Sequence, residues 1–204
     1  MILAEDAISA ILNLLLLGFI PFLLYFAYHR WRQKRTIREV AQLAGLQVGE
    51  ARYIAYAAAI ALVAVAALIL WPPPVESFIR EGSPQKAFAG LGLGGQAIVL
   101  ALLYGVVKTG FPEELLFRGL IAGSLSCRLP PIWANLLQAV IFLLPHLLVL
   151  RIMPEMWTML PLIFVGALVM GWLRMKSGSM LGPALVHAAL NVTICLSVAG
   201  RTGA

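Results

Sequence analysis

Long apolar segments constrain this chain more than any other feature. They lie at residues 7–28, 53–71, 93–126, 132–150, 157–173 and 180–198. A helix needs about 20 mainly apolar residues to cross the hydrocarbon core of a bilayer. Hydrophobic residues make up 61% of the 204 residues and charged residues 12%, whereas soluble domains average about 45–50% and 25%. The sequence therefore predicts an all-α integral membrane protein, a multi-pass bundle of about six transmembrane helices.

The basic residues indicate how these helices are oriented. The net charge is +6, and one loop after the first segment holds a cluster of basic residues: Arg30, Arg32, Lys34, Arg35 and Arg38. Under the positive-inside rule this loop is cytoplasmic, in the cytoplasmic membrane if the source is bacterial or archaeal, and the N-terminus lies outside. Arg128 then falls in a second cytoplasmic loop, and Arg174 and Lys176 fall in a third. No nucleic-acid recognition fold is evident, so we expect the lipid bilayer, and not a nucleic acid, as the partner of the cluster.

Proline and glycine mark the breaks between the apolar segments. These residues are Pro72, Pro73, Pro74, Pro130, Pro131, Pro154 and Gly178. Residues 36–50 place apolar residues at helical spacing, which predicts a short helix lying on the membrane surface. Pro112 leaves the segment 93–126 open between one long, bent helix and two pieces.

The chain reads as one compact membrane domain. We expect residues 1–92 to supply the N-terminal spans with their basic cytoplasmic loop, and residues 93–204 to form the core that carries the chemistry. Two cysteines, Cys127 and Cys195, do not make a disulfide framework. The acidic start of the chain, MILAEDAISA, lacks the basic region of a cleavable signal peptide, so we expect the first segment to be a retained span.

Polar residues inside apolar segments are informative, because a charge at the bilayer centre costs on the order of 2.5–3.5 kcal/mol. The first such cluster is Glu113, Glu114 and Arg118, in FPEELLFR. On a helix Glu114 and Arg118 are four residues apart and are expected to pair. Glu113 lies about 100° away, on another face. The structural alternative is a charge pair at the membrane interface that ends a span.

Two further clusters lie deep in later segments. His146 follows Phe142 by four residues in a segment that a proline bends, and His187 precedes Asn191 by four residues on one helix face. Each cluster alone is equally compatible with a polar contact between helices. Together with Glu113 they supply a carboxylate, two imidazoles and a carboxamide. Around an intramembrane polar cavity, these groups suffice for a hydrolase that activates water.

The ordered motifs EExxxR, FxxxH and HxxxN resemble those of the CPBP family of intramembrane proteases. This family includes the CAAX prenyl endopeptidases and bacterial relatives linked to bacteriocin processing and immunity. The resemblance covers residues 93–198. It implies an intramembrane endopeptidase that cuts near the membrane-associated C-terminus of a membrane-anchored or lipidated protein or peptide.

The resemblance also implies a role for each residue. Glu113 is then the general base, and His146 helps to hold and polarise the attacking water. His187 and Asn191 stabilise the oxyanion of the tetrahedral intermediate. The supporting residues are Glu114, Arg118 and Phe142.

Metal dependence is left open by these residues. Glu113, His146 and His187 make a possible His₂Glu zinc site with water as the fourth ligand. The chain lacks HExxH, whose two histidines would form a ready pair of ligands. We therefore favour a metal-free glutamate mechanism without a cofactor, and keep the zinc metalloprotease as the alternative.

Other functions fit the sequence less well. Asp6 is the only aspartate, which excludes a di-aspartate protease, and the apolar surroundings of Cys195 indicate an inert thiol. A proton-coupled transporter or channel is a further alternative, although no inverted repeat is visible. The last alternative is a non-catalytic immunity or scaffold protein.

Overall fold

The computed structural model describes residues 2–203 and contains no strand over that range. Six of its helices are long and apolar enough to cross a membrane. They are Ala4–Arg32, Ala51–Leu70, Gly95–Ser126, Pro131–Val149, Pro154–Ser177 and Leu181–Thr202. Each helix coincides with a predicted apolar segment, so the expected all-α membrane bundle is confirmed.

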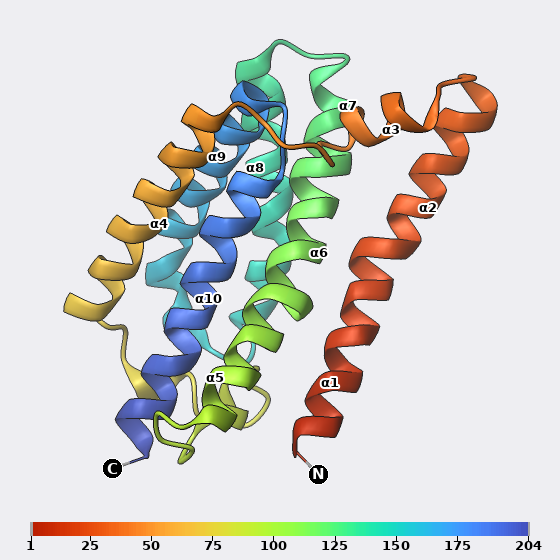
Figure 1. Ribbon diagram of the computed structural model, residues 1–204. Coiled ribbons are helices and arrows are strands. Elements are labelled where there is room, and N and C mark those ends of the chain that lie inside the picture. Colours follow the sequence, from red (N-terminus) through yellow and green to blue (C-terminus); the bar gives the residue numbers. More distant parts are fainter. Residues whose placement is uncertain (1, 204) are drawn as a thin grey trace.

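The first span stands at the side of the bundle (Figure 1). It consists of α1 (Ile2–Asn13) and α2 (Ile20–Ala27), which are joined by the π-helical turn Leu14–Phe19. A second π-helical turn, Tyr28–Arg32, leads to α3. The first span begins and the last span ends at the same end of the bundle, which we call the far end. The basic cluster and α3 lie at the opposite end, which we call the basic end.

The third span is one continuous helix, which resolves the ambiguity of residues 93–126. It runs through α5 (Gly95–Leu102), α6 (Phe111–Glu114) and α7 (Ala122–Ser126). The π-helical segments Leu103–Gly110 (η5) and Leu115–Ile121 (η6) join these pieces. Such wide turns in an otherwise α-helical segment occur frequently at functional sites. Here they flank the four residues FPEE that carry both glutamates.

The surface helix α3 is shorter than the expected 36–50 and covers only Ile37–Leu43. Thr36 is its N-cap and forms a capping box with Glu39. The Thr36 backbone N–H donates to the Glu39 carboxylate, and the Glu39 backbone N–H donates to the Thr36 hydroxyl. Gly45, with a φ of 70°, turns the chain after it, and such a φ favours glycine. The chain then passes over the ends of the last two spans, where the Gly45 carbonyl accepts a hydrogen bond from the Met180 backbone at 3.0 Å.

The last span, α10 (Leu181–Thr202), packs against three of the other spans. It contacts α4 (Ala51–Leu70), the third span along α5 and η5, and α9 (Leu160–Ser177). In Figure 1 it crosses the front of the bundle between α4 and the third span. Gly105 permits this closeness, because a Cβ there would lie 2.9 Å from the Val192 backbone nitrogen. The approach brings the polar residues of α10 against those of the third span.

The periphery of the bundle is apolar, as a lipid-facing surface must be. Large side chains such as Leu62 and Leu24 are about 70% exposed, at 71% and 69%. Exposed tryptophans lie at both ends of the spans, where aromatic residues sit at the level of the headgroups. Trp31 and Trp133 lie beside helix ends at the basic end and Trp71 and Trp157 beside helix ends at the far end, while the exposed Trp172 lies inside α9.

Candidate active site

Glu114 and Arg118 form a buried ion pair in the third span. The Arg118 Nη1 donates to the Glu114 Oε1 at 2.6 Å, as the four-residue spacing predicts, and both side chains are fully buried. The guanidinium carbon also lies 4.1 Å from the centre of the Phe142 ring on α8 (Pro131–Val149). A buried charge is tolerated only when it is paired. The pair therefore fixes this helix against α8 and presents one carboxylate oxygen to α10.

His187 on α10 lies between the two glutamates. Its Nδ1 donates to the Glu114 Oε1 at 2.8 Å, and its Nε2 lies 3.9 Å from the Glu113 Oε2. Because Nδ1 carries the hydrogen that Glu114 accepts, Nε2 either presents a lone pair to Glu113 or carries the second proton of an imidazolium. One imidazole thus links both carboxylates of the third span to the last span.

The two adjacent glutamates differ in hydrogen bonding and in exposure. Glu114 accepts from Arg118 and His187 through one oxygen and is fully buried. The Glu113 side chain is 21% exposed, and its contact with His187 is longer than a hydrogen bond. In the described part of the chain, Glu113 accepts no hydrogen bond. Its carboxylate is therefore the one that a water molecule or substrate can reach.

Asn191 lies one turn beyond His187 and is held by Thr109. Its Nδ2 donates to the Thr109 Oγ1 at 2.8 Å, and the Thr109 hydroxyl donates to the Tyr104 carbonyl at 3.0 Å. The second hydrogen of the Asn191 amide is left for another acceptor. Thr109 was not among the expected site residues. Its position four residues before Glu113, on the same helix, is the signal that indicates it.

His146 and Phe142 form the third side of this group. The His146 Nδ1 donates to the Phe142 carbonyl at 2.9 Å, so a neutral His146 keeps a lone pair on Nε2. The buried Phe142 ring centre lies 4.8 Å from that of His146 and 6.0 Å from that of His187. No hydrogen bond or ion pair among residues 2–203 joins His146 to Glu113. A water shared by these two side chains stays a prediction.

Arg174 lies inside a helix and not, as expected, in a cytoplasmic loop. It is inside α9, which extends to Ser177, and only 8% of its surface is exposed. Its Nε donates to the Arg118 carbonyl at 3.0 Å, and its Nη2 donates to the Leu43 carbonyl at 2.7 Å. Counting it as a loop charge was wrong, because these two carbonyls hold the guanidinium inside the basic end.

The described residues do not form a preassembled cluster of metal ligands. Nowhere in the range 2–203 do three His, Cys, Asp or Glu side chains lie together as a set that could hold an ion. Glu113 and His187 are neighbours, and His146 donates its Nδ1 hydrogen to a backbone carbonyl, which leaves the Nε2 lone pair free. A histidine that binds a metal commonly donates its other ring nitrogen to a carbonyl in this way. The choice between the metal-free mechanism and the His₂Glu zinc alternative therefore stays a prediction.

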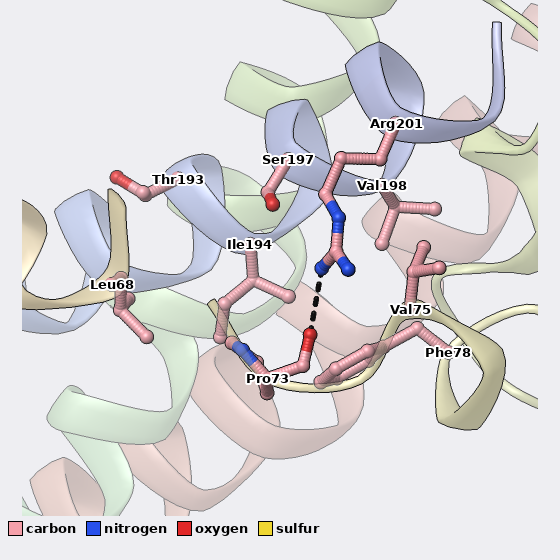
Figure 2. A pocket seen from close by; sticks show the side chains of 9 residues that line it. All are labelled: Leu68, Pro73, Val75, Phe78, Thr193, Ile194, Ser197, Val198 and Arg201. Carbon is pink, nitrogen blue, oxygen red and sulfur yellow. Dashed lines mark hydrogen bonds between the residues drawn. The ribbon is translucent and has the colours of Figure 1, made fainter. Parts of the chain in front are cut away.

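Two hollows of the protein lie away from this group. The smaller lies between the end of α10 and the loop after α4 (Figure 2), where the Arg201 Nη1 donates to the Pro73 carbonyl at 2.7 Å. The larger, which we call the basic-end cleft, has a volume of about 410 Å³. It lies among the chain before α3, α3 itself, α7 and the end of α9, and Arg35, Glu39, Ser126, Cys127 and Arg174 line it. Neither hollow includes Glu113, His146, His187 or Asn191.

Comparison with known families finds a match for the part of the chain that carries this group of residues. Residues 94–193 match the family described as type II CAAX prenyl endopeptidase Rce1-like, and this stretch contains both glutamates, both histidines and Asn191. No curated protein and no solved structure matches the chain. The family implies intramembrane protease activity. The protein is therefore an integral, multi-pass membrane protein that carries an Rce1-like domain, of the CPBP type, at residues 94–193.

Proposed function

We propose that the protein hydrolyses a peptide bond near the membrane-associated C-terminus of a protein or peptide, with Glu113 as the general base. The observation that carries this proposal is the difference between the two glutamates. Glu114 is buried and bonded to Arg118 and His187, whereas Glu113 is accessible and without a hydrogen bond from another described residue. A general base must reach the proton it abstracts, and only Glu113 meets that condition.

The charges of the group support the remaining roles. With His187 as an imidazolium, two carboxylates and two cations, Arg118 and His187, balance within one buried cluster. A balanced cluster avoids the cost of an uncompensated charge in an apolar setting. The imidazolium then carries a hydrogen on Nε2, beside Glu113, where an oxyanion would form. Glu114 keeps that ring oriented through Nδ1.

The reaction follows from these positions. Glu113 takes a proton from water, and the oxygen of that water attacks the carbonyl carbon of the substrate. His187 Nε2–H and the free hydrogen of the Asn191 amide stabilise the oxyanion, and each such donor is worth about 10²–10³ in rate. His146 accepts a hydrogen of the water through Nε2. Glu113 then returns the proton to the leaving amine as the C–N bond breaks.

The substrate class follows from the family and from the membrane. A site between buried spans receives a chain end that is already held at the bilayer. We propose a lipidated or membrane-anchored C-terminus, and a prenylated CAAX peptide is the first candidate because the matched family is named for that substrate.

The test is a cleavage assay on purified protein in detergent. Fluorogenic peptides with a prenylated CAAX end, the same end without the prenyl group, and a transmembrane C-terminus are compared. We expect cleavage by the wild type and a loss of about 10²–10⁴-fold in Glu113→Gln, with an unchanged melting temperature. Normal cleavage by Glu113→Gln would remove Glu113 as the base, and no cleavage of any peptide would favour an immunity or transport role.

Metal dependence is tested on the same preparation. The proposed route needs no metal ion, so chelators should leave the cleavage rate unchanged. Loss of activity on chelation, with recovery at one equivalent of zinc, would replace this route by the metalloprotease alternative.

A further inference from the structure

The basic-end cleft carries an inference that is independent of the proposed proteolysis. Its volume of about 410 Å³ lies within the range of about 300–1,000 Å³ that is common for small-molecule sites. Charged and polar side chains from four different parts of the chain converge on it. They are Arg35, Glu39, Gln42, Ser126 and Arg174.

Arg174 is a buried cation whose neighbours supply no negative charge. Its guanidinium donates to the carbonyls of Leu43 and Arg118, which satisfy hydrogens but do not balance the charge. It forms no ion pair with any Asp or Glu in the part of the chain that the structure describes. The other buried arginine, Arg118, has the Glu114 carboxylate at 2.6 Å. A buried charge normally requires such a partner, so an anion is what the Arg174 site lacks.

The chain segment after α3 holds Arg174 in place at the edge of the cleft. Gly45 passes directly over the guanidinium, since a Cβ there would lie 2.6 Å from the Arg174 Nε. On the other side, a Cβ on Gly123 would lie 3.6 Å from Nη2. Two glycines thus leave room for this side chain between α7 and the chain after α3.

The one acidic side chain that lines the cleft, Glu39, is engaged elsewhere. Its Oε2 accepts from the Thr36 backbone at 2.6 Å and from the Thr36 hydroxyl at 2.9 Å. The backbone hydrogen bond, followed by that of the hydroxyl, lowers the pKa of this exposed carboxyl, so Glu39 stays ionised. Arg35 and Arg174 together still outnumber it, and the lining keeps a positive balance.

Exposed tryptophans lie near the cleft, as they do at the level of lipid headgroups. Pro131 lines the cleft, and the exposed Trp133 follows two residues later on α8. Trp31, which is 75% exposed, lies in the π-helical turn Tyr28–Arg32 that ends the first span at the same end of the bundle. Tryptophans of this kind mark the membrane interface, and a cluster of Lys and Arg marks the leaflet with anionic lipids.

We propose that the basic-end cleft binds the phosphate headgroup of an anionic membrane lipid, with Arg174 and Arg35 as its ligands. Arg174 supplies the buried charge that a phosphate oxygen balances, and Arg35 contacts the same phosphate from the rim. The lipid tails extend along the exposed apolar sides of the neighbouring spans. Because Arg174 also donates to the Arg118 carbonyl, a bound lipid braces the segment that carries the two glutamates.

A native cysteine reports on occupancy of the cleft. Cys127 is exposed and lines it, whereas Cys195 is buried. The purified protein is placed in nanodiscs of phosphatidylcholine with an increasing fraction of phosphatidylglycerol, and the rate of Cys127 modification by N-ethylmaleimide is measured by mass spectrometry. We expect phosphatidylglycerol to slow the modification at least severalfold, and phosphatidylcholine alone to leave it fast.

Matched variants locate the effect in the cleft. Arg35→Gln should raise the phosphatidylglycerol fraction needed for half protection by about fivefold, the effect of about 1 kcal/mol per basic residue, because it removes one of the two cations proposed to contact the phosphate. Arg32→Gln removes the same charge from outside the lining and should behave as wild type. Glu39→Gln keeps the capping box, because Gln also serves at that position, and should lower the fraction needed. Arg174→Gln should abolish protection, and its melting temperature shows whether it is folded.

Specific results would overturn the proposal. An equal loss of Cys127 protection in Arg32→Gln and Arg35→Gln would mean that the basic surface attracts the lipid as a whole, without a specific site. Protection by phosphatidylcholine alone would mean that no anion is required. Glycerol 3-phosphate that protects at a concentration matching the lipid phosphate would identify a soluble phosphate as the ligand. Protection only by a peptide with a free C-terminal carboxylate would assign the cleft to substrate binding.

Discussion

Replacing both members of the Glu114–Arg118 pair should harm the protein less than replacing one. Arg118→Met leaves the Glu114 carboxylate fully buried, with only His187 as a partner. It also removes the guanidinium from the face of Phe142, a contact at 4.1 Å that is worth about 2 kcal/mol when desolvated. Breaking a buried pair by losing one partner costs about 3–5 kcal/mol. We expect a loss of that size in the free energy of unfolding for Arg118→Met, and a similar loss for Glu114→Gln.

The double variant removes both charges at once. Neutral replacements of a buried pair are often nearly neutral for stability, so its loss should be smaller than that of either single variant. The coupling energy from the double-mutant cycle should be at least about 2 kcal/mol, which lies within the range for contacting residues. Reversible unfolding in mixed micelles of mild detergent and SDS measures all four proteins.

The cleavage rate shows whether the Glu114–Arg118 pair also supports catalysis or serves stability alone. The folded double variant should still lose at least about 10²-fold in cleavage rate, because His187 no longer has a charged carboxylate at Nδ1 to support it as an oxyanion donor. Two results would refute this reasoning. One is an Arg118→Met protein within about 0.5 kcal/mol of wild type, the range of ordinary surface changes. The other is a double variant whose loss equals the sum of the two singles.

Three further predictions follow from the contacts of the third span and from the basic end. Thr109→Val removes the hydroxyl that orients Asn191, and it should lower the cleavage rate about tenfold or more with little change in melting temperature. The control Thr193→Val loses a hydroxyl that bonds only to its own helix, so it should stay active. Gly105→Ala places a Cβ against α10 and should lower the free energy of unfolding by about 1–3 kcal/mol. The control Gly166→Ala, whose Cβ would meet nothing within 4 Å, should be tolerated. Unfolding in mixed micelles compares the two variants. On an exposure long enough to overcome the slowing by a bound lipid, a membrane-impermeant maleimide should modify Cys127 in inverted vesicles and leave it unmodified in intact cells, and the reverse result would invert the predicted orientation.

The six spans could be predicted because continuous apolarity is sufficient to define them. No partner helix is needed to make 53–71 or 132–150 helical in a bilayer, since every backbone group must be satisfied within the segment. The ends of the spans depend also on contacts with the rest of the chain. α9 runs on to Ser177 past Arg174, since two backbone carbonyls at the basic end hold that charge, and neither carbonyl is visible as a partner in the sequence.

The local part of the candidate site was also predictable. Glu114 and Arg118 are neighbours on one helix, so their spacing alone predicts the pair. Contacts between spans were not predictable in the same way. The bond from Asn191 to Thr109 joins residues 82 positions apart and depends on how closely α10 approaches η5. Gly105 permits that approach, but glycine is common in membrane spans, so its presence in the sequence does not mark the contact.

Two neighbouring glutamates have different surroundings because successive residues of a helix point about 100° apart, and the π-helical turns beside them shift the directions in which both point. A turn that closes from residue i to i+5 is wider than an α-helical turn and shifts the side chains that follow it. Such turns lie on both sides of FPEE, and the propensities of LYGVVKTG and LLFRGLI do not distinguish them from an ordinary α-helix. In the resulting arrangement Glu114 faces Arg118 and His187, while Glu113 remains accessible on the other side of the same imidazole. Both carboxylates are evident in the sequence, but the position of His187 between them, fixed by α10, is what gives them different surroundings and, in the proposed mechanism, different roles.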